Sequence, residues 1–488
     1  MAYKHGVYIK ENETSVAAPV LGTAGLQVIF GTAPINLVEN PSAAVNKPIL
    51  VNNYAEAVAA VGYSDDYESY TLMQSIDASF KLFNVAPIVL VNVLDPAKHK
   101  ATVAEASYTV KDGQATVNVE GLLLSTLSVK VDTTALKEGE HYTASFDDNG
   151  YAVITLTSDG KIVLGDKTSV SVSGTKIDPS AVTENDIIGG INASTGAESG
   201  LEVIRQVFPT LGYTPGLIIA PGWSHNAKVG AAIQAKCVEI NDNFTCECVL
   251  DIPTTEGTAT KYTDVKKIKD EYGYNSKHSI LAWPKVLYAG KQMYYSAALA
   301  ALIAYTDANN DDVPSLSPSN KLLGISGTVL ENGTEVVLDQ PQANVLNSFG
   351  VVTALNFNGW RSWGDNTACY PSNTDPKDRW INCRRMFSWQ ANSFILTYFN
   401  RVDDPANYRL IESIVDEENV RGNSLVAQGA VAGMRIEYNA DENPIDKIIE
   451  GTMIFHQYFA PYSPAQVIEN TLEFSPAMLE AALNGESE

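Results

Sequence analysis

Short runs of apolar residues recur along the chain, separated by segments with helical spacing. The run Ala86–Pro96 is apolar at nearly every position, which is typical of a strand covered on both faces in a parallel sheet. The runs expected to be strands are Leu26–Pro34, Ala86–Pro96, Gly216–Pro221, Phe244–Asp251 and His278–Pro284.

Between these strands, apolar residues repeat every three to four positions, as on one face of an amphipathic helix. The helix Tyr294–Tyr305 is apolar nearly all round, which predicts that it is buried. Alternation of strands with helices predicts an α/β fold with an open, mostly parallel sheet. The predicted helices are Tyr54–Gly62, Tyr67–Phe83, Glu198–Phe208, His225–Ile240, Thr263–Tyr272 and Tyr294–Tyr305.

The segment from about Thr102 to Pro179 has a different pattern. Apolar and polar residues alternate in the runs ATVNV, YAVITLT and SVSVS, and turn pairs such as Asp112-Gly113 and Asn149-Gly150 separate such runs. This pattern predicts a compact all-β insert in the α/β series. We expect it to be an exposed decoration, and a role as a surface adhesin is one alternative.

The two ends of the chain contain extended segments with no obvious pairing partner. Val7 and Ile9 alternate with Tyr8 near the start. Near the end, a run in which Ile468, Leu472 and Phe474 share a face follows Pro461 and Pro464. Prolines disfavour a tight hairpin return, so this last strand is predicted to leave the domain body.

The net charge limits the functions that the chain can have. It carries 33 Lys+Arg and 57 Asp+Glu, a net charge of −24 with a pI near 4.6. Such a surface repels phosphate backbones and anionic lipids, so we expect no nucleic-acid partner. The start of the chain has no apolar secretory segment and the longest apolar run is too short for a bilayer, so no membrane insertion is expected. The 5 cysteines do not suggest a disulfide scaffold, and cytoplasmic synthesis is predicted.

The sequence gives little evidence for a catalytic, cofactor or metal site. The chain has neither a phosphate-binding GxxxxGK[ST] nor a GxGxxG motif, so no cofactor is expected. Cys237, Cys246 and Cys248 could form a zinc site with His225, but their periodicity favours core packing. No metal ligand is therefore assigned.

A hydrolase is the principal alternative function. The motif GISGT, Gly324 to Thr328, departs from the GxSxG pattern by one residue. Asp251, His225 and Ser326 could be brought together as a triad, although nothing in the sequence requires it. No catalytic residue is assigned.

The run DRWINCRRMFSW, Asp378 to Trp389, is unusually basic for this chain. It reads as an amphipathic helix whose arginines either pair with local acids or form a contact patch for an acidic partner.

Seven segments, read in order, resemble the contractile tail sheath family of phage tails and R-type bacteriocins. They are HGVYIKENE, VIFGTAP, KPILVNNYAEAVAAVGYSDD, VNVLDP, DIIGG, TPGLIIAPGWS and GWRSWGDNTA followed by DRWINCRR. The resemblance covers nearly the whole chain except the insert.

The resemblance implies a structural subunit and not an enzyme. Sheath subunits stack as six-fold rings around a tail tube, between baseplate and tail terminator proteins, and contract to drive the tube through a cell envelope. Terminal arms add as strands to neighbouring subunits; here these are Tyr3 to Glu13, with Val7, Tyr8 and Ile9, and Ala465 to Phe474, with Ile468, Leu472 and Phe474. Arg379, Arg384 and Arg385 are possible tube contacts. The particle is a virion tail or a bacteriocin.

The resemblance also implies a subtilisin-like sheet without a working triad and an α+β C-terminal domain. The expected division is 1–20, N-terminal arm; 21–100, first part of the α/β domain; 101–185, all-β outer insert; 186–355, α/β domain continued; 356–463, tube-facing domain; and 464–488, C-terminal arm and tail.

Overall fold

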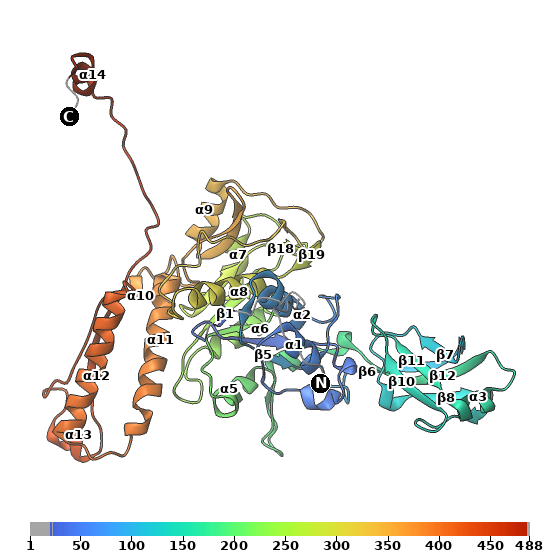
Figure 1. Cartoon of the computed structure of the whole chain (residues 1–488). Helices are drawn as coiled ribbons and strands as arrows, with labels where there is room; N and C mark the ends of the chain where they lie inside the picture. Colours follow the sequence, from blue (N-terminus) through green and yellow to red (C-terminus); the bar gives the residue numbers. More distant parts are fainter. Residues whose placement is uncertain (1–19, 22, 486–488) are drawn as a thin grey trace, which may run out of the picture.

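The computed structural model describes residues 20–21 and 23–485. Figure 1 shows a central α/β body, a β-rich insert that projects from one side, and a pair of long helices on the opposite side. The C-terminal segment leaves this helix pair and extends away from the body. The expected strand with Val7, Tyr8 and Ile9 lies outside the described residues.

A central sheet forms the core of the body. Five of its strands are buried at every position, and for β5 the near-continuous apolar run predicts this burial. The six inner strands run parallel, and the two outer strands pair antiparallel with them. The predicted α/β fold with a large, mostly parallel sheet is confirmed. In spatial order the eight strands are β22 (Trp360–Trp363), β21 (Val351–Asn356), β17 (Ser279–Ala282), β16 (Glu247–Asp251), β15 (Leu217–Ile219), β2 (Gln27–Gly31), β5 (Ile88–Asn92) and β3 (Ile49–Val51).

Helices accompany the sheet in the predicted order. The helix expected at Tyr294–Tyr305 is buried along nearly its whole length, as its apolar composition predicts. The helix expected from Tyr67 begins only at Leu72, and residues 67–69 form a turn in which Asp66 accepts hydrogen bonds from Glu68 N and Ser69 N. The helices of the body are α1 (Tyr54–Val61), α2 (Leu72–Asp77), the π-helical η3 (Ala78–Leu82), α4 (Glu184–Ile188), α5 (Ile204–Leu211), α6 (Ala227–Ala235), α7 (Val265–Tyr272), α8 (Tyr295–Ala308) and α9 (Gln340–Ser348).

Short elements fill the connections of the body. The helix expected from Glu198 starts later, because Glu198 and Ser199 pair as a strand with residues 190–191. The short elements are β1 (Val20–Leu21), η1 (Ile35–Leu37), η2 (Pro41–Ala44), β4 (Val85–Ala86), η5 (Pro179–Ala181), β13 (Gly190–Ile191), β14 (Glu198–Ser199), η6 (Gly200–Val203), β18 (Lys285–Tyr288), β19 (Lys291–Met293) and β20 (Gly327–Val329).

The insert has two small sheets around an apolar core of its own. The expectation that it is all-β is wrong at one place: Thr157 caps a short helix, α3 (Ser158–Leu164), by accepting a hydrogen bond from Gly160 N. The strands are β6 (Lys100–Thr109), β7 (Gln114–Val117), β8 (Ser128–Val131), β9 (Thr134–Ala135), β10 (Tyr142–Phe146), β11 (Ala152–Leu156) and β12 (Ser169–Ile177), with the 3₁₀ turn η4 (Leu124–Thr126).

The C-terminal section is built around the two long helices seen in Figure 1. Two strands form a separate antiparallel sheet beside them. The elements are α10 (Pro376–Arg379), α11 (Ile381–Tyr398), η7 (Phe399–Arg401), α12 (Tyr408–Ala427), β23 (Val431–Glu437), α13 (Ile445–Ile449), β24 (His456–Pro461) and α14 (Pro476–Leu483).

Candidate functional site

The C-terminal arm, residues 462–475, begins at the first turn of α11. Asn382 Nδ2 donates to the carbonyl oxygen of Tyr462 at 3.0 Å. Four residues later, Gln466 accepts from Arg379 Nη2 at 3.1 Å and donates to Asp365 Oδ1 at 3.3 Å. These contacts hold the base of the arm against the body.

Arg379 is the centre of this arm base. Its guanidinium lies over the rings of Tyr370 and Trp380, at 4.3 and 3.9 Å from their centroids. Its Nε donates to Asn366 Oδ1 at 2.8 Å, so a planar cation is held on several sides at once. The sequence singled out Arg379 for its charge, but nothing in the local pattern indicated Asp365 or Gln466 as its neighbours.

Asp365 is the acidic member of the arm base. Burial raises the pKa of its carboxyl group to about 6, although Arg379 and Gln466 favour the charged form. The carboxylate therefore gains or loses its charge in mildly acidic solution.

Beyond Gln466 the arm is extended and exposed. Within the described part of the chain, residues 467–474 make no hydrogen bond. The apolar side chains Ile468, Leu472 and Phe474 are 87%, 89% and 77% exposed. The arm thus leaves the domain body, as the prolines predict, and Figure 1 shows it running away from α11.

In the two-stranded sheet of β23 and β24, one edge is more open than the other. Asn419, on α12, donates to the carbonyl oxygen of Ile436 and accepts from its N–H, at 3.1 and 3.0 Å. This side chain partly occupies the outer edge of β23. No strand of the described chain pairs with the outer edge of β24.

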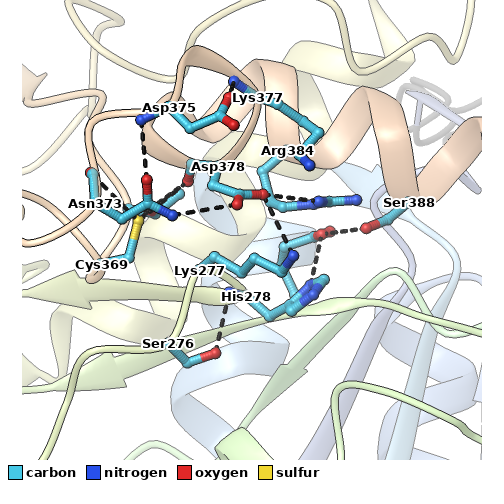
Figure 2. A network of polar contacts seen from close by, with 12 residues as sticks. Ser276, Lys277, His278, Cys369, Asn373, Asp375, Lys377, Asp378, Arg384 and Ser388 are labelled. Atoms are coloured by element: carbon cyan, nitrogen blue, oxygen red, sulfur yellow. Dashed lines mark hydrogen bonds and ion pairs between the residues drawn. The ribbon is translucent and has the colours of Figure 1, made fainter.

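The basic run of α11 lies against the body and carries buried charges. Figure 2 shows Arg384 and Lys277 converging on Asp378, with nitrogen-to-oxygen distances of 3.1 and 3.4 Å. Burial alone would raise the pKa of Asp378, but Lys277, Lys377 and Arg384 hold it below its usual value. Arg384 is therefore a member of an ion-pair network that joins α11 to the body.

Arg385 makes a second buried ion pair. Its guanidinium engages both carboxylate oxygens of Asp307, on α8, and the two side chains are 3% and 1% exposed. Arg384 thus pairs with a local acid, as one alternative expects, whereas Arg385 pairs with an acid on a distant helix. Neither guanidinium is presented on the surface of the single chain.

One helical turn after Arg384 and Arg385, Ser388 makes a further polar contact between α11 and the body. Its hydroxyl donates to Glu247 Oε1 at 2.6 Å, and His278 approaches the same oxygen at 3.5 Å (Figure 2). Burial opposes ionisation of Glu247, yet these partners keep its pKa below the usual value. The first half of α11 is thus attached to the sheet by charged and polar contacts.

The residues considered for hydrolysis do not form a triad. Asp251 accepts hydrogen bonds from Ser224 at 2.9 Å and from Ser296 at 2.5 Å, both in the core. The ring of His225 stacks on Tyr294 at 5.2 Å, and Ser326 donates to the carbonyl oxygen of Leu287. Burial raises the pKa of Asp251 to about 6.

The cysteines considered for zinc are buried in the core. Burial raises the pKa of Cys237, Cys246 and Cys248, which disfavours the thiolate form that binds metal. Across residues 20–21 and 23–485, no group of three or more His, Cys, Asp or Glu side chains is arranged to hold a metal ion. The helices in that part of the chain are all too short or too polar to cross a membrane.

Comparison with known proteins finds tail sheath proteins among the chain's curated relatives. No protein-family model matches the chain. The tail sheath protein of Burkholderia phage BcepMu is 25% identical over 493 residues, which cover 98% of each chain. The resemblance to the contractile tail sheath family is confirmed. The tail sheath protein of Escherichia phage P2 is 24% identical over 296 residues, covering 59% of this chain and 69% of that protein.

Solved sheath structures share the fold. A chain of the anti-feeding prophage baseplate has a TM-score of 0.58 at 15% identity, covering 97% of this chain and 100% of that one. A chain of the PVC extracellular contractile injection system, in its contracted sheath complex, has a TM-score of 0.57 at 15% identity, covering 98% and 99%. The sheath tail protein of Desulfitobacterium hafniense has a TM-score of 0.51 at 11% identity, covering 94% and 100%. The mixed α/β architecture is thus that of contractile sheath subunits.

Proposed function

We propose that the chain is the structural subunit of a contractile tail sheath. It polymerises as stacked six-fold rings around a tail tube and contracts to drive the tube through a target cell envelope. Similarity to a phage tail sheath protein from end to end supports this proposal. Its partners are other copies of itself, the tail tube protein, and the baseplate and tail terminator proteins of a phage tail or bacteriocin particle.

The observation that carries the proposal is the unpaired arm. Residues 467–474 expose backbone donors and acceptors together with four large apolar side chains, of which Ile468, Leu472 and Phe474 share one face. A monomer gains nothing from such a segment, because an unpaired exposed strand invites pairing with other chains. Addition to a sheet edge of a neighbour satisfies the backbone and buries the side chains.

The outer edge of β24 is the acceptor that we propose. The competing edge, on β23, is partly occupied by Asn419. An arm held at Gln466 and paired at residues 467–474 to the next subunit connects the subunits while their bodies rotate. Contraction then needs no nucleotide, since repacking of interfaces drives it.

We also propose the domain division expected from the sequence, with the insert of 101–185 on the outside and 356–463 toward the tube. The insert has a separate apolar core, which supports its treatment as a separate unit. Of the three predicted tube contacts, Arg384 and Arg385 have buried internal partners. Arg379 is half-buried, and its part in tube contact stays a prediction.

The test compares two neighbouring arm positions that receive the same substituent. Leu472→Asp places a carboxylate on the face shared with Ile468 and Phe474, whereas Thr471→Asp places it on the opposite face. Loss of a buried leucine costs about 1.5–3 kcal/mol, so Leu472→Asp should raise the critical concentration for tube formation by at least about tenfold. Thr471→Asp should change it little. The measurement is sedimentation of polymer, with negative-stain electron microscopy of the pellet.

Truncation after Pro464 is the complementary experiment. It should give dispersed, folded subunits, whereas the full-length chain forms hollow, striated tubes. Normal tubes from the truncated chain, or equal effects of Leu472→Asp and Thr471→Asp, would contradict strand addition.

A further inference from the structure

The last helix of the described residues, α14, is short and buries none of its side chains. Met478, Leu479 and Leu483 are 76%, 50% and 79% exposed. At about 100° per residue, these three side chains and Ala482 lie within one face about 140° wide. An isolated helix of 8 residues is only marginally stable in water, so this face needs an apolar partner.

An apolar groove lies elsewhere on the same chain. Its walls are Phe208 and Pro209 of α5, Phe244 before β16, Leu396 near the end of α11, and Phe399 of η7. The rings of Phe208 and Phe244 pack at 4.7 Å, and the groove encloses about 370 Å³.

The groove is unusually free of charge for this protein. None of its lining residues is acidic or basic, and its only polar side chains belong to asparagines. Asn241 and Asn243 are occupied by local hydrogen bonds to backbone carbonyl groups. Leu396 and Phe399 remain 43% and 65% exposed, which leaves an apolar surface open to a partner. Such a groove favours an uncharged apolar helix over a charged surface.

We propose that α14 of one subunit docks in the groove of a second subunit. The inference rests on the proposed polymer and extends it: the arm carries a terminal anchor as well as a strand. Helix-in-groove docking places Met478, Leu479 and Leu483 against Phe208, Phe244 and Phe399, and it leaves Glu480 at the rim. Strand pairing and helix docking then hold the same arm at two separate surfaces.

The direction of the arm favours a second copy over docking within one chain. The arm is held at the start of α11, near Asn382, whereas the groove lies at the other end of that helix, about 21 Å away at 1.5 Å per residue. Figure 1 shows the arm and α14 extending away from both long helices. Docking in the same chain would require the arm to turn back along α11, and this would withdraw residues 467–474 from a neighbour's sheet.

Disulfide trapping between two different full-length chains tests the proposal. One chain carries Leu396→Cys and the other carries Leu479→Cys, so that any 396–479 disulfide joins two subunits. All five native cysteines are buried and therefore compete little. The matched control replaces Leu396→Cys with Val420→Cys, an exposed position on α12 that does not line the groove.

The mixed chains are oxidised with oxidised glutathione at concentrations that allow assembly, and dimers are measured by non-reducing electrophoresis. We expect the 396–479 disulfide at least tenfold above the 420–479 control. No excess over the control would overturn the proposal. A disulfide formed within dilute monomers of a Leu396→Cys/Leu479→Cys double variant, without the intermolecular product, would also overturn it, because α14 would then cover the groove of its own chain.

The result is separable from that of the proposed function. If tubes form but the 396–479 disulfide does not, docking of α14 is wrong and the proposed polymer still holds. If the disulfide forms but tubes do not, docking of α14 holds and the proposed sheath assembly is wrong.

Discussion

The buried ion pair between Arg385 and Asp307 gives the most decisive prediction about how α11 is attached to the body. The substitution Arg385→Met keeps an unbranched side chain but leaves the carboxylate of Asp307 buried without its cation. Arg385 also donates to the carbonyl oxygen of Ala24 at 3.4 Å, so the contact next to β2 is lost as well.

The expected loss of stability follows from the burial of the two side chains. The Arg385 and Asp307 side chains are 3% and 1% exposed, and removal of one partner from such a pair costs about 3–5 kcal/mol. The double variant Arg385→Met/Asp307→Leu removes both charges and should recover most of that loss. Arg435→Met is the control, because its pair with Glu437 is 63% and 37% exposed and is worth at most about 1 kcal/mol.

Urea unfolding followed by tryptophan fluorescence and circular dichroism measures these differences. Because the chain has more than one core, the comparison uses the transition in which the central body unfolds. The reasoning is refuted if the free energy of unfolding of Arg385→Met lies within about 1 kcal/mol of that of the control variant. It is also refuted if the double variant is no more stable than the single one. Retained tube binding by the double variant would in addition remove Arg385 from the predicted tube contacts.

Three further predictions concern the core and the insert. A Cβ on Gly230 would lie 2.0 Å from the hydroxyl oxygen of Tyr274, so Gly230→Ala should cost about 1–3 kcal/mol, whereas Gly433→Ala meets nothing within 4 Å and should be nearly neutral in urea unfolding. The pKa of Asp251 is raised from 3.8 to about 6 in the folded protein, so folding favours its protonated form and the free energy of unfolding should fall as pH rises from about 4 to 6. Asp251→Asn should reduce that fall by an amount on the order of 3 kcal/mol in unfolding measured across this pH range, leaving the part that Asp365 contributes; an unchanged slope would contradict the assignment. Excision of 102–175, with Ala101 and Lys176 joined by Asn-Gly, should leave the body folded and assembling because these residues are paired antiparallel neighbours; loss of tubes in electron microscopy would contradict the outer placement of the insert.

The elements of the body were predictable because burial on both faces leaves a strong local pattern. The runs that contain β2, β5, β15, β16 and β17 are rich in apolar residues, and each is a strand of the central sheet. Element boundaries were less accurate where a side chain competes for the backbone. Asp66 binds the backbone of a turn that precedes α2, and Thr157 caps a helix within the insert.

The functional residues were predicted less completely. The departure of the arm after Pro464 was predictable, since proline prevents a hairpin return and the following run has no nearby partner. The charge of the basic run was also visible, but which arginines face inward was not. Arg384 and Arg385 are adjacent in sequence, yet their acids, Asp378 and Asp307, come from different elements.

The sequence by itself determined where strands and helices form, that the insert differs from the body, and that the last strand has no local partner. These properties depend on periodicity and on residues close together along the chain. The tertiary structure alone decided that Arg379 meets Gln466, that Arg385 lies against α8, and that α5 and α11 enclose an uncharged groove. Each of these depends on contacts between distant segments, whose energies follow from burial and geometry that no local pattern records.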